Sequence, residues 1–581
     1  MIRQENRISI RGGKCYTFYI MLTFFKDAKF LLLLLFGLAC LFRILWLESL
    51  PATFFIDEVL SGYLGRYMIL NHMDIFGNPF PWLYFNKFGD YYIVAPMYLD
   101  GISTFIFGVT RFATRFPTAL IGALAVFPVY CITTKIFVKK SIGLFAAFLT
   151  VCLPWYVVLA RATTESVIEL TVVLCVVCAL LFASENKHRL QWLLIGFSLS
   201  LLSYLIYHTA RILVPLIWIG YVVLFFNKLR TSRSLILSAC IGTTILFLVT
   251  LGISQTEWGR GRFNQTSIFS VQSGVSIRMT EMTYNLGSNS VLLARVFHNK
   301  IVGYGREFIT QYFHYVNPLF LFTDQAWLKT RYGVPETGPA YLTILLMILS
   351  ILIPTRSKFV INQSALHLLI WILLIAPLPA ALTVIESPNV RRSILLSVPL
   401  VIAAAYGWNR SFSIRWRIFK LGYLFTLFLC IEVVFFMYHY VKQSDMYNSL
   451  YRTDGQAEIV EYLGTQSPAN TYMVTDSLEF PLYYLFATKD FSAEYASRFK
   501  SELRIDSLGT IQPRQELCAI NLPADVVTAL STQDQVIEPA RCQFDACRFS
   551  SISSITGVNH LLKFRVLIPN KGSGENPDCG E

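Results

Sequence analysis

The strongest constraint on this chain is a series of long apolar runs. A helix needs about 20 mostly apolar residues to cross the hydrocarbon core of a bilayer. Eleven segments meet or approach this length, at residues 30–48, 112–134, 141–159, 165–183, 190–207, 212–227, 234–253, 339–354, 365–385, 393–409 and 419–440. Charged residues make up only 15% of the chain, well below the share in soluble domains. The sequence therefore predicts a polytopic α-helical membrane protein with about eleven transmembrane helices.

The basic residues between the apolar runs predict how the spans are oriented. Lys and Arg cluster after every second span, at residues 135–140, 187–189, 228–233, 356–358 and 410–420. Cytoplasmic loops carry such an excess, so residues 1–29 are expected to be a cytoplasmic N-terminal segment, with no cleavage site after the first span. The net charge of +13 then reflects topology and contact with membrane lipid, and we expect no nucleic-acid partner.

Residues 93–108 are apolar enough to suggest a further span. The segment contains Asp100 and Pro96, and a crossing there would move the lysines of residues 135–140 to the outside. We interpret it as a juxtamembrane or re-entrant helix on the outer face. The membrane domain then covers residues 30–440 of a multi-pass plasma (inner) membrane protein, and its outer loops are residues 50–111 and 255–338.

The C-terminal tail, residues 441–581, has a different character from the apolar runs. Residues 457–463 have the pattern of a helix, and residues 471–475 and 561–568 have the pattern of strands. We predict a small extracytoplasmic α/β domain, which recognises an acceptor or a partner or only caps the membrane domain. Its four cysteines show no metal-ligand spacing, so they can form disulfides in an oxidising compartment: Cys518, Cys542, Cys547 and Cys579.

An acid pair, Asp57-Glu58, follows the first span almost immediately. Ionisable residues are costly near a bilayer, so such a pair indicates a functional site. A helix that begins here explains the pair equally well, with Asp57 as its cap and Glu58 in its first turn. Apolar residues recur at helical spacing through residues 59–67, which predicts an interfacial amphipathic helix.

Several further segments resemble a known family when they are taken together with this acid pair. They are residues 107–122, Leu153-Pro154-Trp155 with Arg161 and Glu165, residues 207–211, and residues 379–392. Their order and spacing resemble the GT-C membrane glycosyltransferases, specifically bacterial relatives of protein O-mannosyltransferases and of the aminoarabinose transferase that modifies lipid A. The resemblance covers about residues 30–440. The family often has an Asp where this chain has Glu165.

The resemblance implies an inverting transfer of a sugar from a polyprenyl-phosphate donor to an acceptor hydroxyl at the outer face of the membrane. The acceptor can be a protein, a glycolipid or a cell-envelope polymer. A carboxylate must take the proton of the attacking hydroxyl, and a carboxylate also stabilises an oxocarbenium-like transition state. We predict Asp57 as the general base. Glu58 is the second catalytic candidate, which either orients the outer-loop helix or helps to bind a cation.

The leaving phosphate needs counter-charge, and polar residues at outer span ends or in outer loops are candidates to bind the substrates. They are Lys87, Asp90, Arg161, Glu165, His208, Arg211, Arg391 and Arg392. The outer loop 255–338 is also basic, either to attract an anion or as a solvated face.

Each of these residues has a structural alternative. Arg161 and Glu165 have the spacing of an (i, i+4) ion pair, and His208 and Arg211 can close a span end as a polar network. Lys87 and Asp90 can be surface charges of the loop. Arg391 and Arg392 are basic residues on the predicted outer side, where the positive-inside rule expects few of them. Their structural alternative is to extend to the lipid headgroups of the outer leaflet.

A divalent cation, Mg²⁺, Mn²⁺ or Zn²⁺, is a further candidate partner, although the chain has no contiguous ligand motif. Oxygen and nitrogen ligands are available from Asp57, Glu58, Asp90, Glu165 and His208. The alternative function is a transporter or flippase of lipid-linked sugars, and a third is a structural or partner-binding membrane protein. Transporters more often place ionisable residues mid-span on broken helices. The acids here gather at one face, which favours an enzyme.

Overall fold

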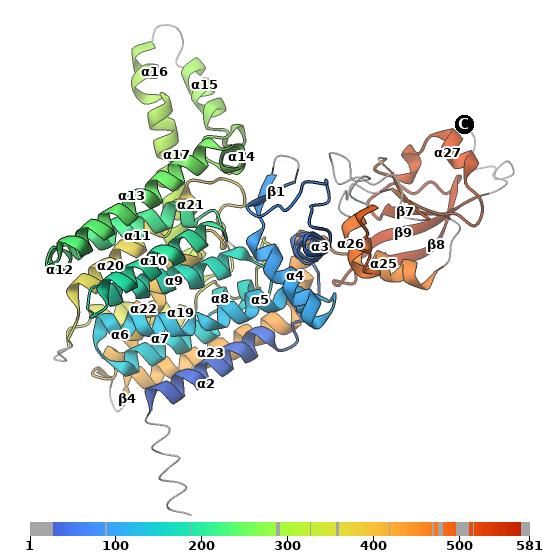
Figure 1. Ribbon diagram of the computed structural model, residues 1–581. Helices are drawn as coiled ribbons and strands as arrows, with labels where there is room; N and C mark the ends of the chain where they lie inside the picture. Colours follow the sequence, from blue (N-terminus) through green and yellow to red (C-terminus); the bar gives the residue numbers. More distant parts are fainter. Residues whose placement is uncertain are drawn as a thin grey trace, which may run out of the picture.

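The computed structural model describes residues 27–87, 90–185, 187–285, 291–325, 327–355, 360–416, 419–466, 470–474, 480–494, 510–514 and 516–570. The cytoplasmic segment predicted at residues 1–29 lies almost entirely outside these ranges. A large bundle of helices forms most of the molecule, and a smaller domain built on a sheet lies at one end of it (Figure 1).

Every predicted span coincides with helix. The bundle contains α2 (Ala28–Ile44), α5 (Arg111–Leu124) with α6 (Val126–Phe137), α7 (Lys140–Cys152) with α8 (Pro154–Ala160), α9 (Glu165–Ala183), α10 (Arg189–Tyr204), α11 (Ala210–Leu224), α13 (Arg233–Gln255), α19 (Leu342–Leu349), α20 (Gln363–Ile375) with α21 (Leu378–Ala381), α22 (Ser397–Ser411) and α23 (Leu421–Lys442). The break before α8 falls at Pro154, which cannot donate a backbone hydrogen bond to continue α7.

The described residues contain five helices that are long and apolar enough to cross a membrane. They are Arg111–Phe137, Glu165–Ala183, Arg233–Gln255, Gln363–Ala381 and Leu421–Lys442, and a sixth results if α7 and α8, which meet at 50°, form one span. The predicted helical, multi-pass membrane fold is confirmed. The count of eleven spans stays a prediction, because the other expected spans are helices that are shorter than this length.

The loop at residues 50–111, which is predicted to lie on the outer face, folds into two helices and a hairpin. Helix α3 (Ile56–Asn71) carries the acid pair in its first turn, and α4 (Ala95–Phe107) is the helix expected at residues 93–108. The antiparallel strands β1 (Tyr84–Lys87) and β2 (Asp90–Ile93) lie between them in the chain. The two helices cross in backbone contact, since a Cβ added to Gly65 would lie 1.9 Å from the carbonyl oxygen of Met97.

The smaller domain confirms the predicted α/β tail. Its sheet has the order β6-β5-β7-β9-β8, with β5 (Thr471–Val474) parallel to β6 (Ile511–Arg514) and to β7 (Gln535–Pro539). Strands β8 (Phe549–Thr556) and β9 (Leu562–Pro569) complete it in antiparallel register. Helices α25 (Gln456–Thr465) and α26 (Phe480–Thr488) lie on the side of the sheet toward the bundle (Figure 1).

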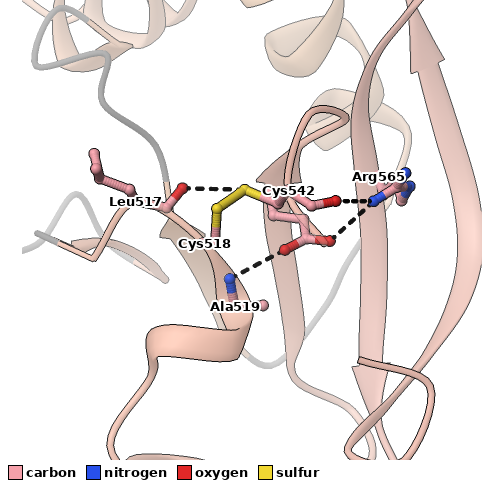
Figure 2. The surroundings of a disulfide bond; sticks show 6 residues. Leu517, Cys518, Ala519, Cys542 and Arg565 are labelled. Carbon is pink, nitrogen blue, oxygen red and sulfur yellow. Dashed lines mark hydrogen bonds and ion pairs between the residues drawn. A yellow bond between two sulfur atoms is a disulfide. The ribbon is translucent and has the colours of Figure 1, made fainter. Parts of the chain in front are cut away.

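A disulfide between Cys518 and Cys542 ties together two loops of this domain (Figure 2). Beside it, the backbone N–H of Ala519 donates to Glu538, and Arg565 donates to the carbonyl oxygen of Cys542 at 2.9 Å. Cys579 lies outside the described residues. The sequence left open whether these cysteines form disulfides, and the structure pairs Cys518 with Cys542.

Helix α3 is packed between the bundle and the smaller domain. Its buried residues Tyr63 and Leu64 share one apolar core with Leu482 and Phe486 of α26. The hydroxyl of Tyr483 donates to the carbonyl oxygen of Phe54 at 2.8 Å, just before α3. The helix that carries the acid pair is thus held from two sides.

We expect Gly65→Ala to destabilise the protein, because the added methyl group must push the α3 and α4 backbones apart. Overpacking of this kind costs about 1–3 kcal/mol. The measurement is the thermal unfolding temperature of the purified protein in detergent, with Gly37→Ala as the control, since a Cβ at Gly37 meets nothing within 4 Å. Equal unfolding temperatures for the two variants would contradict the close crossing.

Candidate active site

A cavity of about 710 Å³ lies at the end of the bundle where α3 and the smaller domain are found. Its walls come from α3, β2, the starts of α9 and α11, the junction of α13 with α14 (Glu257–Thr266), and the segment before α22. Six of the ten predicted site residues line this cavity: Asp57, Glu165, His208, Arg211, Arg391 and Arg392. Residues that are more than 300 positions apart in the chain are thus brought into one cavity.

The ends of the helices bring these side chains together. Asp57 lies in the first turn of α3, and Glu165 is the first residue of α9. Acidic side chains are stabilised at helix N-termini, where the backbone N–H groups carry partial positive charge. Arg211 lies in the first turn of α11, so three helices begin at the cavity.

Asp57 contacts an arginine that was not among the predicted substrate-binding residues. Arg331 donates from Nη1 to Oδ2 of Asp57 at 2.8 Å and from Nη2 to Oε1 of Glu386 at 2.5 Å. The hydroxyl of Tyr92 donates to Oδ1 of Asp57 at 3.4 Å. The only sequence signal for Arg331 is the basic character of the loop 255–338.

Glu386 was also missed, and it links the arginines of the cavity. Arg391 donates to its second carboxylate oxygen at 3.2 Å, and Asn389 donates to the same oxygen at 2.9 Å. Burial raises the pKa of Glu386, but the neighbouring Arg391 and Arg331 outweigh this effect and lower the pKa to about 2. Glu386 is therefore an anion at neutral pH and neutralises part of the arginine cluster.

Glu58 does not line the cavity, although it was predicted beside Asp57 as a catalytic residue. Its carboxylate accepts hydrogen bonds from Nε of Arg115 at 2.7 Å and from Nη2 of Arg452 at 3.0 Å. The side chain is only 3% exposed. Burial alone would raise the pKa of Glu58, but the two arginines lower it to about 2. This geometry fits the expected role of orienting the outer-loop helix.

Arg161 also lies away from the cavity. Its guanidinium donates to the carbonyl oxygens of Phe42 at 2.9 Å and Leu50 at 3.0 Å, so it binds the backbone where α2 ends. Lys87 and Asp90 are backbone partners at the end of the β1–β2 hairpin, and their side chains lie outside the described part of the structure.

His208 and Arg211 form the polar network expected at a span end, and both also line the cavity. Nη1 of Arg211 lies 3.0 Å from Nδ1 of His208, and its guanidinium lies 4.5 Å from the ring centroid of Trp258. The ring of Trp258 thus holds the guanidinium of Arg211 at the cavity wall, where this guanidinium can bind an anionic substrate.

The described residues do not form a metal site. In the searched part of the chain, no group of three or more His, Cys, Asp and Glu side chains could hold a metal ion. Of the predicted ligands, Asp57 and Glu58 bind arginines and His208 lies against Arg211. Asp57, Glu58 and His208 therefore do not form a ligand set for a cation.

The fold and the site define a helical membrane protein that has a cavity lined by acidic and basic side chains at one end of its bundle. Residues 94–253 match the family model described as Dolichyl-phosphate-mannose-protein mannosyltransferase. This match covers 160 of the 581 residues. Over that part it confirms the predicted resemblance to membrane glycosyltransferases, and it supports the prediction that the chain is an enzyme of that class. The matched segment contains Glu165, His208 and Arg211 and begins after Asp57.

Several solved structures resemble this one at low sequence identity. The archaeal oligosaccharyltransferase AglB from Archaeoglobus fulgidus, in complex with an inhibitory peptide and a dolichol-phosphate, has 15% identity and a TM-score of 0.45, and the likeness covers 80% of this chain and 64% of AglB. ArnT from Cupriavidus metallidurans bound to undecaprenyl phosphate has 11% identity and a TM-score of 0.48, covering 93% of this chain and 98% of ArnT.

The arabinofuranosyltransferase AftD from Mycobacteria has 10% identity and a TM-score of 0.41, covering 94% of this chain and 42% of AftD. A further structure of the Archaeoglobus fulgidus oligosaccharyltransferase contains Zn and sulfate. No curated protein matches the chain.

We expect Glu58→Gln to destabilise the protein, because it leaves Arg115 and Arg452 buried without a carboxylate. Breaking a buried pair on one side costs about 3–5 kcal/mol. The measurement is thermal unfolding, with the exposed Glu461→Gln as the control.

The same carboxylate predicts a dependence on pH. The pKa of Glu58 in the folded protein, about 2, lies below the usual 4.5, so its stabilisation is complete above about pH 4.5 and is lost as the pH falls toward 2. In this pH range, the unfolding temperature of the wild-type protein should therefore approach that of Glu58→Gln. A constant difference between the two unfolding temperatures down to pH 3 would contradict the lowered pKa of Glu58.

Proposed function

We propose that this enzyme transfers a sugar from a polyprenyl-phosphate donor to an acceptor hydroxyl, with inversion at the anomeric carbon and with Asp57 as the general base. One observation carries the proposal: Asp57 and a cluster of arginines line the same cavity at one end of the bundle. The matched family, named for dolichyl-phosphate-mannose as its donor, supports a lipid-phosphate-linked sugar. The proposed orientation places this end at the outer face of the plasma membrane.

In the proposed reaction, the acceptor oxygen forms a bond with the anomeric carbon while the bond from that carbon to the phosphate oxygen breaks. The acceptor proton moves to Asp57, and the bond electrons leave with the polyprenyl phosphate. Oδ2 of Asp57 is held by Arg331, whereas Oδ1 has only a long contact with Tyr92 among the interactions described. Oδ1 is therefore the oxygen that we assign as the proton acceptor.

The arginines supply the counter-charge for the phosphate. The cavity is lined by Arg211, Arg260, Arg331, Arg391 and Arg392 and by the carboxylates Asp57, Glu165 and Glu386. Five cations against three anions leave a surplus of two positive charges. The donor carries one negative charge and the departing phosphate monoester carries two, so this surplus can offset the charge of the leaving group. Charged groups that are already in place where negative charge develops stabilise such a transition state.

The remaining predicted site residues take different places in the proposal. Glu165 and His208 line the cavity and are proposed to contact the sugar or the acceptor. Glu58 and Arg161 are proposed as positioning residues, because their contacts fix the backbone around α3 and α2. Lys87 and Asp90 are proposed to contact a substrate, because they belong to the hairpin whose residues Tyr91 and Tyr92 line the cavity.

We expect Asp57→Asn to reduce sugar transfer about 10²–10⁴-fold, because the acceptor hydroxyl loses its proton acceptor. The measurement is transfer by the reconstituted protein from a panel of radiolabelled polyprenyl-phosphate sugars. Asp525→Asn, at an exposed position of the smaller domain, is the matched control. Asp57 also binds Arg331, so the unfolding temperature of each variant is recorded.

Equal transfer by wild type and Asp57→Asn would exclude Asp57 as the base. Movement of the labelled lipid across the bilayer without transfer to any acceptor would favour the alternative, a flippase of lipid-linked sugars.

We expect Arg392→Gln to raise the KM for the donor about 10–100-fold, since a hydrogen bond to a charged group contributes about 1.5–3 kcal/mol. Arg392 lines the cavity and is 8% exposed, and it donates to the carbonyl oxygen of Ile385 at 3.1 Å. Arg541→Gln, on the exposed surface of the smaller domain, is the control. An unchanged KM for the donor would remove Arg392 from the proposed phosphate site.

A further inference from the structure

The segment that follows α13 projects away from the bundle. It contains α14 (Glu257–Thr266), α15 (Val275–Asn285), α16 (Val291–Phe297) and α17 (Lys300–Val316). Figure 1 shows α15 and α16 standing clear of the bundle and running at a steep angle to α2 and α23. Gly259, Arg260 and Phe263 of α14 line the cavity, so this projecting segment begins at the rim of the candidate active site.

Helix α17 has its apolar side turned outward. Its buried residues are Gln311 and Tyr315, and Gln311 donates to Glu307 of the same helix. Val302, Ile309 and Phe313, at spacings of seven and four, are 42%, 55% and 62% exposed. A helix on the surface of a soluble protein buries its apolar stripe and exposes its polar one. The reversed arrangement is typical of a helix that faces lipid.

Helix α16 exposes a second apolar surface. Its residues Val291, Leu292, Leu293, Val296 and Phe297 are each 49% to 76% exposed. Contiguous apolar patches of this kind are rare on soluble monomers and indicate an interaction surface for a membrane or another protein.

Charge and position identify the partner as a lipid surface. The exposed basic residues Arg295, Lys300 and Arg306 accompany the apolar ones, whereas Arg278 is paired with Glu307. The hydroxyl of Tyr312 in α17 donates to the carbonyl oxygen of Leu374, one residue before α20 ends. Helix α17 also packs against α21, which forms the end of the candidate span Gln363–Ala381. The apolar stripe of α17 therefore lies beside a helix end where the bundle leaves the hydrocarbon core, which is the level of the headgroups.

We propose that the segment α15–α17 is a membrane-surface element that binds anionic phospholipids of the leaflet at the cavity. Leu292, Phe297, Ile309 and Phe313 enter the hydrocarbon, while Arg295, Lys300 and Arg306 bind the headgroup phosphates. Amphipathic helices bind interfaces through this combination of apolar area and basic charge. The element holds the rim of the cavity at the headgroup level. Such lipid binding is independent of the sugar-transfer chemistry.

The test places a nitroxide label at Leu292→Cys or Ile309→Cys in the full chain, with Thr310→Cys as the matched control on the same helix. Thr310 is exposed and adjacent in sequence to Ile309, but it lies outside the apolar stripe. Native cysteines are accounted for by subtracting the spectrum of the labelled parent protein. Collision rates with oxygen and with a water-soluble nickel complex are measured in nanodiscs that contain 30% anionic lipid.

We expect labels at residues 292 and 309 to collide with oxygen and to be protected from nickel, whereas the label at residue 310 collides with nickel. Equal access of nickel to all three labels would overturn the proposal. Spectra that depend on the number of protein copies per disc, and not on the lipid, would assign the surface to a second copy of the chain and would also overturn it.

The headgroup contacts are tested by the variant Arg295→Gln, Lys300→Gln, Arg306→Gln. We expect the ratio of lipid-inserted to water-exposed label at residue 292 to fall up to about fivefold per removed charge in anionic discs, and to change little in zwitterionic discs. Arg541→Gln, on the smaller domain, is the control. A ratio that is the same for all variants and both lipid compositions would contradict binding to anionic headgroups.

Discussion

The structure around the cavity depends on one buried carboxylate between two arginines. Glu58 is 3% exposed and binds Arg115, which is fully buried, and Arg452. Removing these charges from water is costly unless all three are paired and hydrogen-bonded. Arg115 also donates to the carbonyl oxygens of Leu47 and Pro51, so the ion pair fixes the turn between α2 and α3.

This constraint separates the roles of two adjacent acids. Successive residues of an α-helix point about 100° apart, so a helix that directs Glu58 into the protein interior can direct Asp57 elsewhere. Asp57 lines the cavity, where Arg331 holds it. Arg452 comes from the segment that leads into the smaller domain, and α26 packs on α3. A domain without a recognisable chemical motif thus contributes to the position of the proposed base.

The sequence predicted the helices, the acid pair at the start of α3, and the meeting of distant outer segments at one end of the bundle. Hydrophobic run length and the alternation of basic loops are local signals, and they suffice for those features. The partners of the acids could not be predicted in the same way. Arg331 lies 274 residues from Asp57 and Arg452 lies 394 residues from Glu58, so their pairing follows only from tertiary packing. The partners of Arg161 could not be predicted for the same reason, because the backbone carbonyls at the end of α2 carry no sequence signature.

Arg331 connects the electrostatics of the cavity to the proposed chemistry. It is shared by Asp57 and Glu386, and it lies over the ring of Phe55 at 4.1 Å. An anionic donor that binds Arg331 competes with both carboxylates for its hydrogen bonds. Glu386 keeps Arg391 and Asn389 as partners, whereas Asp57 keeps the longer contact with Tyr92. Under the proposed function, donor binding therefore weakens the hold on Asp57 more than the hold on Glu386, which frees the base when the phosphate is in place.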